Sequence, residues 1–219
     1  MSTPDVLADP RSFYAARFVR ATVGNLLIAL FRVRVIGQDN VPATGAVLAG
    51  NHVSYADPAL LWCIAPRQCH FMAKSELFEN GIIAWGLPRL WAFPVKRGQA
   101  DRAAILAATE LLKRGELVGI FPEGTRKKHD AMGEAQQGAS FIAMRAGVPI
   151  IPVGIQGTDR IKPKGAHFMR FPRVTIRYGE PVAFANIDEA AGNRKQRMEL
   201  MTTEVMRRIS GLLADESNG

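Results

Sequence analysis

Short apolar segments alternate with helical segments along most of the chain, and this alternation limits the possible folds more than any other feature. Brief apolar runs bounded by turn residues are typical of buried strands. Such runs occur at residues 46–50, 69–73, 93–95, 117–121, 149–155 and 174–178. Helical patterns occupy residues 57–65, 100–114, 138–146 and 189–213. The alternation predicts an α/β fold, in which a mostly parallel sheet carries helices on both faces.

The length of the chain fits one large domain better than two. Its 219 residues, 47% of them hydrophobic, can bury a substantial core, and no internal repeat is visible. We expect residues 1–36 to form an N-terminal membrane-interface helix followed by an edge strand. Residues 37–219 are expected to form the α/β domain, as one structural unit with the segment before it.

The N-terminal segment carries an apolar helical face with arginines around it. A helix over residues 11–30 gathers five aliphatic side chains on one face, which are Val19, Val23, Leu26, Leu27 and Leu30. The surrounding arginines are Arg11, Arg17, Arg20, Arg32 and Arg34. Such an amphipathic helix either lies in a membrane interface or packs on the core with its arginines in solvent. Residues 21–31 are uncharged but too few to span a bilayer, which takes roughly 20 apolar residues. Residues 31–35 then alternate apolar and basic side chains, as a half-exposed edge strand does.

The charge of the chain favours anionic partners without choosing among them. The net charge is +8 and the isoelectric point is about 9.9. This suits nucleic acid, anionic lipid, phosphorylated metabolites or an acidic carrier protein, and it also suits a protein whose charge only prevents aggregation. Cys63 and Cys69 lack metal-ligand spacing and are expected to be buried and reduced, as in a cytoplasmic protein. Residues 1–10 lack the basic and apolar regions of a signal peptide.

A histidine and an aspartate flank the loop between the first buried strand and the helix after it. His52 follows the strand directly, and Asp57 opens the helix. An imidazole can take a proton from a hydroxyl near neutral pH, and a carboxylate on its other nitrogen fixes the tautomer and stabilises the imidazolium. A five-residue step across a loop lets the two side chains meet, although such a pair is also common as a purely structural hydrogen bond.

No motif for a covalent nucleophile accompanies this pair. The sequence G-x-S-x-G is absent, and neither cysteine has a second histidine at suggestive spacing. We therefore expect His52 to act directly on a substrate hydroxyl, without a covalent enzyme intermediate.

Two basic loops follow other predicted strands. Residues 121–128 read Phe-Pro-Glu-Gly-Thr-Arg-Lys-Lys, in which the glycine permits close approach of the backbone and Arg126 offers a planar fork for phosphate oxygens. Lys96, Arg97 and Gly98 follow another strand. Because the carboxyl ends of parallel strands share one edge, the histidine and both basic loops would meet there around a phosphorylated substrate. The alternative for residues 121–128 is a turn with solvated basic side chains.

Together these segments resemble the glycerolipid acyltransferase family, which includes the 1-acyl-sn-glycerol-3-phosphate acyltransferases. The family's first block, a histidine and an aspartate separated by four residues and often preceded by asparagine, corresponds to Asn51, His52 and Asp57. Its third block, Phe-Pro-Glu-Gly-Thr-Arg, is complete from Phe121 to Arg126, and its fourth, Val-Pro-Ile-Ile-Pro-Val, is complete from Val148 to Val153.

The second block is a partial match. It ends in an arginine after an apolar strand, which Arg97 provides, while Lys96 stands where the family commonly has aspartate. A lysine or an aromatic residue often precedes the family's Gly-Ala pair, and here Gln136 and Gln137 precede it. The resemblance extends over residues 35–178, with the blocks in the family's order and spacing.

The resemblance implies a role for each matched position. His52 would be the general base on the acceptor hydroxyl, and Asp57 would orient it. The acceptor phosphate would be bound by Arg97, Glu123, Gly124, Thr125 and Arg126. The acyl donor would be acyl-CoA or acyl carrier protein, and no cofactor or metal would be needed.

The expected reaction acylates 1-acyl-glycerol-3-phosphate (lysophosphatidic acid) to phosphatidic acid in phospholipid biosynthesis. The enzyme would lie peripherally on the cytoplasmic face of a membrane with anionic lipid and would bind no nucleic acid. Residues 81–90 would line an acyl tunnel, touch the bilayer or belong to the core. One alternative is an acyltransferase for glycerol-3-phosphate, another lysophospholipid or a glycolipid. A non-catalytic basic module for membranes or nucleic acid is a distant alternative, because it leaves the paired motifs unexplained.

Overall fold

The structure is a computed structural model that describes residues 10–79, 81–96, 101–122, 137–163, 165, 168–187 and 193–214. A seven-stranded sheet runs through it in the order β1-β7-β6-β2-β5-β3-β4. The strands are β1 Arg34–Ile36, β2 Ala46–Gly50, β3 Cys69–Lys74, β4 Ala92–Val95, β5 Leu117–Ile120, β6 Ile150–Gln156 and β7 Thr175–Tyr178. Every neighbouring pair is parallel except β6 and β7, so β1 and β7 run against the other five strands.

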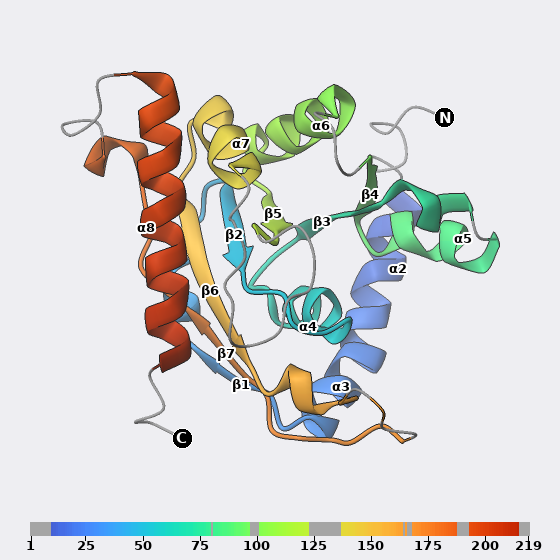
Figure 1. The fold of residues 1–219 in the computed structure, drawn as a ribbon. Helices are drawn as coiled ribbons and strands as arrows, with labels where there is room; N and C mark the ends of the chain where they lie inside the picture. The colour runs from blue at the N-terminus through green and yellow to red at the C-terminus, as the bar shows by residue number, and fades with distance from the viewer. Residues whose placement is uncertain are drawn as a thin grey trace.

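Helices cover both faces of this sheet (Figure 1). The N-terminal and central helices are α2 Pro10–Val19, the π-helical turn η1 Arg20–Gly24, α3 Asn25–Leu30, α4 Ala56–Ile64 and α5 Gly81–Arg89. The later helices are α6 Arg102–Lys113, α7 Gly138–Ala146 and α8 Arg194–Ala214. Short 3-10 helices lie at η2 Gln38–Asn40, η3 Ser75–Glu79, η4 Thr158–Arg160 and η5 Phe184–Asn186. The predicted α/β class, with a mostly parallel sheet and helices on both faces, is confirmed.

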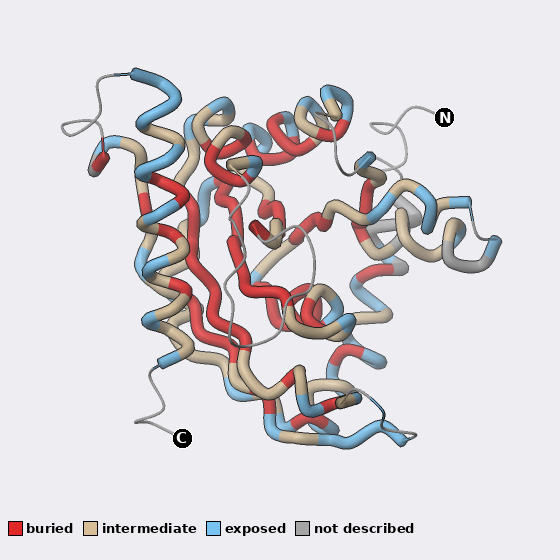
Figure 2. Tube along the Cα trace, in the orientation of Figure 1, coloured by how far each residue is buried: buried red, intermediate tan, exposed pale blue. Residues whose placement is uncertain are grey.

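Strand β2 shows why the central strands are continuous apolar runs. All five of its residues are buried, and their side chains alternate between the two faces of the sheet. Ala46 and Leu48 join the core beneath α4, whereas Val47 and Ala49 join the core beneath α6, α7 and α8. The buried segments of Figure 2 follow these strands through the middle of the molecule.

Glycine fixes two helix ends and one tight contact. Gly115 and Gly147 follow α6 and α7 with φ of +87° and +71°, the left-handed region that glycine adopts without steric cost. Both helix ends are predicted from these glycines. Gly119 in β5 has a different role, because a Cβ there would lie 2.1 Å from the ring of Phe71. The glycine therefore leaves room for the Phe71 ring to lie against the sheet.

The edge strand begins later than its alternating pattern predicts. Phe31 and Val33 still donate backbone hydrogen bonds to Leu27 and Ile28 of α3, so the chain leaves the helix only at Arg32, where φ is +45°. The predicted strand at residues 31–35 is therefore wrong at its start, and β1 begins at Arg34. The C-terminal helix is confirmed from Arg194 to Ala214, and the first predicted residues, 189–192, lie outside the described part of the chain.

The N-terminal helix is present, but its five aliphatic residues do not share one environment. Val19 and Leu27 pack against the core, whereas Val23, Leu26 and Leu30 are exposed. The π-helical turn contributes to this division, because it shifts the helical phase between α2 and α3. Arg11 lies outside the described side chains. Across the described residues, no helix is both long enough and apolar enough to cross a membrane.

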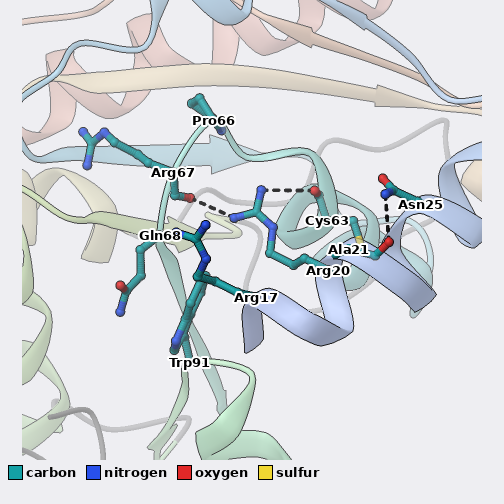
Figure 3. Close-up of a pocket in the computed structure, with 9 residues that line it drawn as sticks. All are labelled: Arg17, Arg20, Ala21, Asn25, Cys63, Pro66, Arg67, Gln68 and Trp91. Atoms are coloured by element: carbon teal, nitrogen blue, oxygen red, sulfur yellow. Dashed lines mark hydrogen bonds between the residues drawn. The ribbon is translucent and has the colours of Figure 1, made fainter. Parts of the chain in front are cut away.

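Arg20 is an inward-facing side chain rather than one of a ring of outward-facing arginines. Its guanidinium donates to the carbonyls of Cys63 and Ala65, at 3.2 and 2.5 Å, and to that of Arg67 at 3.5 Å (Figure 3). Burial lowers the pKa of Arg20, and the ring of Trp62 lies 5.8 Å from its guanidinium carbon. A cation at the carboxyl end of a helix satisfies carbonyls that have no partner within the helix. Arg20 thus fastens the N-terminal helix to the end of α4.

A hollow of about 530 Å³ opens beside this contact. Its lining includes Arg17, Arg20, Cys63, Arg67 and Trp91, which Figure 3 shows around the carboxyl end of α4. The guanidinium of Arg67 donates to backbone carbonyls, as that of Arg20 does, so both cations have structural partners. The hollow lies at the end of α4 away from Asp57, and it is therefore separate from the predicted catalytic pair.

Replacing Arg20 with methionine is expected to lower the free energy of unfolding by about 2–4 kcal/mol, because buried carbonyls lose a charged donor. Urea denaturation of the purified protein measures this change. Arg114→Met is the matched control, since the Arg114 side chain is half-exposed and pairs with Glu110 on the same helix. The control should cost less than about 1 kcal/mol. Equal effects of both substitutions would contradict the structural role of Arg20.

The apolar segment at residues 81–90 forms α5, near the β4 edge of the sheet (Figure 1). Trp85 on this helix is exposed, while Leu87 is half-buried. The interpretation of the whole segment as core is therefore wrong at Trp85. The side chains of Ile82 and Ile83 lie outside the described part of the chain.

Candidate active site

His52 and Asp57 meet where β2 gives way to α4. The Nδ1 atom of His52 lies 3.0 Å from Oδ2 of Asp57. The same carboxylate oxygen accepts backbone hydrogen bonds from Val53 at 2.8 Å and Ser54 at 2.7 Å. Asp57 is fully buried in the first turn of α4, at the positive end of the helix dipole, and it accepts the backbone hydrogen bonds of Val53 and Ser54 there. The loop is thus folded around Asp57, and the histidine is one of three groups that it holds.

This hydrogen bond determines which nitrogen of His52 can act as a base. A carboxylate is only an acceptor, so Nδ1 carries the proton that is donated to Asp57 in the neutral imidazole. The lone pair is then on Nε2, and this atom can accept a proton from a hydroxyl. Asp57 would stabilise the imidazolium that results.

An aromatic ring fixes the plane of the imidazole. The ring of Phe121 stacks on His52 with centroids 4.4 Å apart and planes inclined by 26°. Phe71 continues the stack, with its centroid 6.2 Å from that of Phe121. A Cβ on Gly50 would lie 3.4 Å from the Phe121 ring, which shows how closely the strand end approaches this ring. Sequence reasoning missed this role of Phe121, because it connects residues 69 positions apart.

Asn51 extends the sheet by one more pair of hydrogen bonds. Its side-chain Nδ2 donates to the carbonyl of Ile155 at 2.9 Å, and its Oδ1 accepts from the amide of Ile155 at 2.7 Å. The side chain thereby imitates a backbone partner just beyond the last β2–β6 register pair, Gly50 and Val153. Asn51 is buried and fixes the point at which the chain turns toward His52. The sequence offered an asparagine after an apolar strand as the only signal of this role.

The structure places the start of the second predicted loop, at Phe121, beside the first loop. Ala49 of β2 pairs with Ile120 of β5, so Phe121 follows at the level of Gly50, and its ring reaches the imidazole of His52 two residues further on. Glu123, Gly124, Thr125 and Arg126 lie outside the described residues, and their predicted phosphate-binding role stays a prediction.

Arg97 also lies outside the described residues. The strand before it, β4, runs parallel to β2 and ends at the same edge, as predicted. In the sheet order β4 is three strands from β2, which corresponds to about 14 Å between their ends. The loop that contains Arg97 would have to extend along this edge to reach a substrate at His52.

Both cysteines are buried and free, as the sequence predicts. Burial raises the pKa of the Cys63 and Cys69 thiols, which disfavours the thiolate that a nucleophile requires. Neither residue belongs to the loop around His52. The site therefore agrees with direct action of the histidine on a substrate.

Comparison with known proteins gives matches to one family. A sequence model described as Acyltransferase matches residues 32–156. The 1-acyl-sn-glycerol-3-phosphate acyltransferase of Bacillus subtilis is 36% identical over 82% of this chain and 87% of its own length. A second relative is LPAT1, a chloroplastic 1-acyl-sn-glycerol-3-phosphate acyltransferase of Arabidopsis thaliana. It is 33% identical, and the match covers 62% of this chain and 39% of the plant protein.

A solved structure shows a similar fold over nearly the whole chain. The 1-acyl-sn-glycerophosphate (LPA) acyltransferase PlsC of Thermotoga maritima matches with a TM-score of 0.71 and 25% sequence identity. The match covers 98% of this chain and 88% of that one.

Proposed function

Because this chain belongs to the acyltransferase family, we propose that it transfers a fatty acyl chain to the free hydroxyl of 1-acyl-glycerol-3-phosphate, giving phosphatidic acid. The acyl donor is acyl-CoA or acyl carrier protein. The observation that carries the proposal is the buried His52–Asp57 hydrogen bond, at the sheet edge where the Phe121 loop begins. The names of the relatives support the choice of acceptor.

The reaction follows from the geometry of this pair. Nε2 of His52 takes the proton of the acceptor hydroxyl as the oxygen attacks the thioester carbonyl. The tetrahedral intermediate collapses, the carbon–sulfur bond breaks, and the thiolate leaves with the proton returned by the imidazolium. Asp57 stabilises the imidazolium between these two proton transfers. The ester product and a free thiol balance the reaction without a cofactor or metal.

The acceptor phosphate is assigned to the basic loops. Arg126 binds it through paired hydrogen bonds, Glu123, Gly124 and Thr125 shape the loop around it, and Arg97 adds positive charge. The Phe121 ring supports this assignment, because it fixes the start of the loop against His52. A phosphate bound there would present a nearby hydroxyl to the imidazole.

Arg126→Ala is expected to raise the KM for the acceptor about 10- to 150-fold, since a charge-assisted hydrogen bond contributes roughly 1.5–3 kcal/mol. Steady-state kinetics with each substrate varied separately measure the effect. Lys113→Ala, which removes an exposed cation from α6, is the matched control and should leave both KM values unchanged. A raised donor KM with an unchanged acceptor KM would assign the loop to the donor.

Other acceptors define the alternative reaction. Glycerol-3-phosphate, another lysophospholipid or a glycolipid also offers a hydroxyl near an anionic or polar group. A panel of these acceptors with labelled acyl-CoA, analysed by lipid mass spectrometry, tests the proposed substrate. The proposal expects the highest kcat/KM for 1-acyl-glycerol-3-phosphate, and a higher value for another acceptor would replace it.

We further propose that the enzyme lies peripherally on the cytoplasmic face of a membrane. The acceptor and product are lipids, and α3 exposes Leu26 and Leu30. Burial of apolar side chains at the interface and attraction of cations to anionic lipid would hold the helix there. In this proposal residues 1–36 are the interface element, and residues 37–219 form the acyltransferase domain as one unit with it. Nucleic acid is not proposed as a partner.

A further inference from the structure

The connection between β6 and β7 carries exposed apolar and basic side chains. From Arg160 to Arg173 the sequence contains five lysines and arginines and no acidic residue. Phe168 is 85% exposed and Met169 is 58% exposed. We define the β6–β7 surface by six of the exposed residues of this connection, which are Arg160, Lys162, Phe168, Met169, Arg170 and Arg173.

Hydrogen bonds and a ring contact hold this surface in place. The amide of Arg170 donates to the carbonyl of Ile161 at 2.8 Å, which closes the base of the loop on a buried residue. The Phe171 ring lies 5.7 Å from that of Phe31, and Arg32 donates to the Phe171 carbonyl at 2.8 Å. Phe168 and Met169 are therefore presented to solvent by a loop that is fixed to the end of α3.

The β6–β7 surface and the catalytic pair lie at the same end of the sheet, where β6 and β2 have their carboxyl ends. Gln156, the last residue of β6, pairs with Thr175, which pairs with Arg34 at the start of β1. Asn51, next to His52, is hydrogen-bonded to Ile155 of the same β6 end. The β6–β7 connection and α3 lie in the lower part of Figure 1, toward which the carboxyl end of β2 points, and the connection is largely exposed in Figure 2.

We propose that the β6–β7 surface is a second lipid-contacting element, which with α3 seats the catalytic edge of the sheet on an anionic bilayer. The inference rests on the function proposed above, because a lipid acceptor makes the bilayer the source of substrate. Large apolar side chains would enter the interface, and the cations around them would meet anionic headgroups. Contacts from two elements, α3 and the loop beside it, restrict the orientation of the protein on a surface more than a single helix does.

The exposed phenylalanine and methionine favour a bilayer over an acidic carrier protein as the occupant. Exposed large apolar groups next to each other are uncommon on a surface that meets only water, and they mark interaction sites. A carrier protein would be attracted by the arginines and lysine alone, whereas insertion into lipid also uses Phe168 and Met169. The complementary charge is supplied by anionic headgroups.

Flotation of the full chain with vesicles tests the proposal. The vesicles contain phosphatidylcholine with phosphatidylglycerol, or phosphatidylcholine alone. Phe168→Ser/Met169→Ser should weaken partition into the anionic vesicles at least about tenfold, and Lys162→Gln/Arg170→Gln should weaken it about 30-fold at low salt. The matched controls lie on α6, where Leu106→Ser and Arg102→Gln/Lys113→Gln change exposed residues of the same kinds and should leave partition unchanged.

The outcomes separate this inference from the proposed function. Partition of both loop variants equal to that of the parent would overturn the inference, as would an equal loss in the α6 controls. If the loop variants float as the parent does but lose turnover only with carrier-bound thioester, the surface binds carrier protein. This outcome would also overturn the inference. Leu26→Ser tests docking by α3 independently. Formation of diacyl product by the parent from a short-chain, monomeric lysophosphatidic acid tests the proposed reaction without a bilayer.

Discussion

His52→Ala is expected to lower turnover about 10²- to 10⁴-fold, because the acceptor hydroxyl loses the group that takes its proton. The change is expected in kcat, since nothing in the geometry assigns His52 to binding the acyl chain or the phosphate. Single-turnover measurements with labelled thioester and acceptor separate this loss from product release. A folded variant with near-parental turnover would exclude His52 as the base.

His70 provides a matched control for the His52→Ala substitution. His70 is also a buried histidine, and its Nε2 contacts the carboxylate of Glu116. It lies near the start of β3, so the His70–Glu116 pair is at the amino ends of the parallel strands, whereas His52 is at their carboxyl ends. His70→Ala should lower stability through the loss of buried contacts while turnover per folded molecule stays close to that of the parent. Equal catalytic losses in both variants would point to misfolding rather than to chemistry.

Asp57→Asn is expected to lower kcat about 10²- to 10³-fold with little change in the fold of the loop. All three donors, from His52, Val53 and Ser54, converge on the single oxygen Oδ2. An asparagine oxygen in that position can accept the same three hydrogen bonds, so the tautomer of His52 is kept. The substitution therefore removes mainly the negative charge. The attraction between two such charges is worth about 4 kcal/mol at 4 Å in a partly screened site. Only part of this attraction is lost in kcat, because the imidazolium charge is only partly developed in the transition state.

Asp57→Ala distinguishes charge from geometry. Alanine removes the charge and also leaves the partly buried amides of Val53 and Ser54 without their side-chain acceptor, so thermal stability should fall as well as kcat. Thermal melts and kinetics on both variants measure the two effects. If Asp57→Asn retained parental kcat, the carboxylate would have a structural role only.

The sheet could be predicted from the sequence because its central strands are short, fully buried and apolar on both faces. The predicted limits of β2, residues 46–50, are those of the structure, and so are the limits of α7, which ends just before Gly147. In both cases the signal is local, since it consists of a buried run or a glycine at a helix end. The start of β1 was not predictable in this way, because alternation at residues 31–35 could not reveal that Phe31 and Val33 still donate hydrogen bonds to carbonyls of α3.

The contacts that sequence reasoning missed are non-local. The inward direction of Arg20 depends on the carbonyls at the end of α4, 43 to 47 positions away. The stacking of Phe121 on His52 depends on the pairing of β2 with β5. The His52–Asp57 contact was predictable, because five residues across a strand-to-helix loop limit where the two side chains can lie.

The central claim is that this acyltransferase acylates 1-acyl-glycerol-3-phosphate through His52. The most direct measurement incubates the purified full chain with labelled acyl-CoA, or the matching acyl carrier protein thioester, and 1-acyl-glycerol-3-phosphate in anionic vesicles, with phosphatidic acid detected by mass spectrometry. We predict labelled phosphatidic acid from the parent and at least about a hundredfold less from His52→Ala. Parental yields from folded His52→Ala, or no phosphatidic acid from the folded parent with either donor, would contradict the claim.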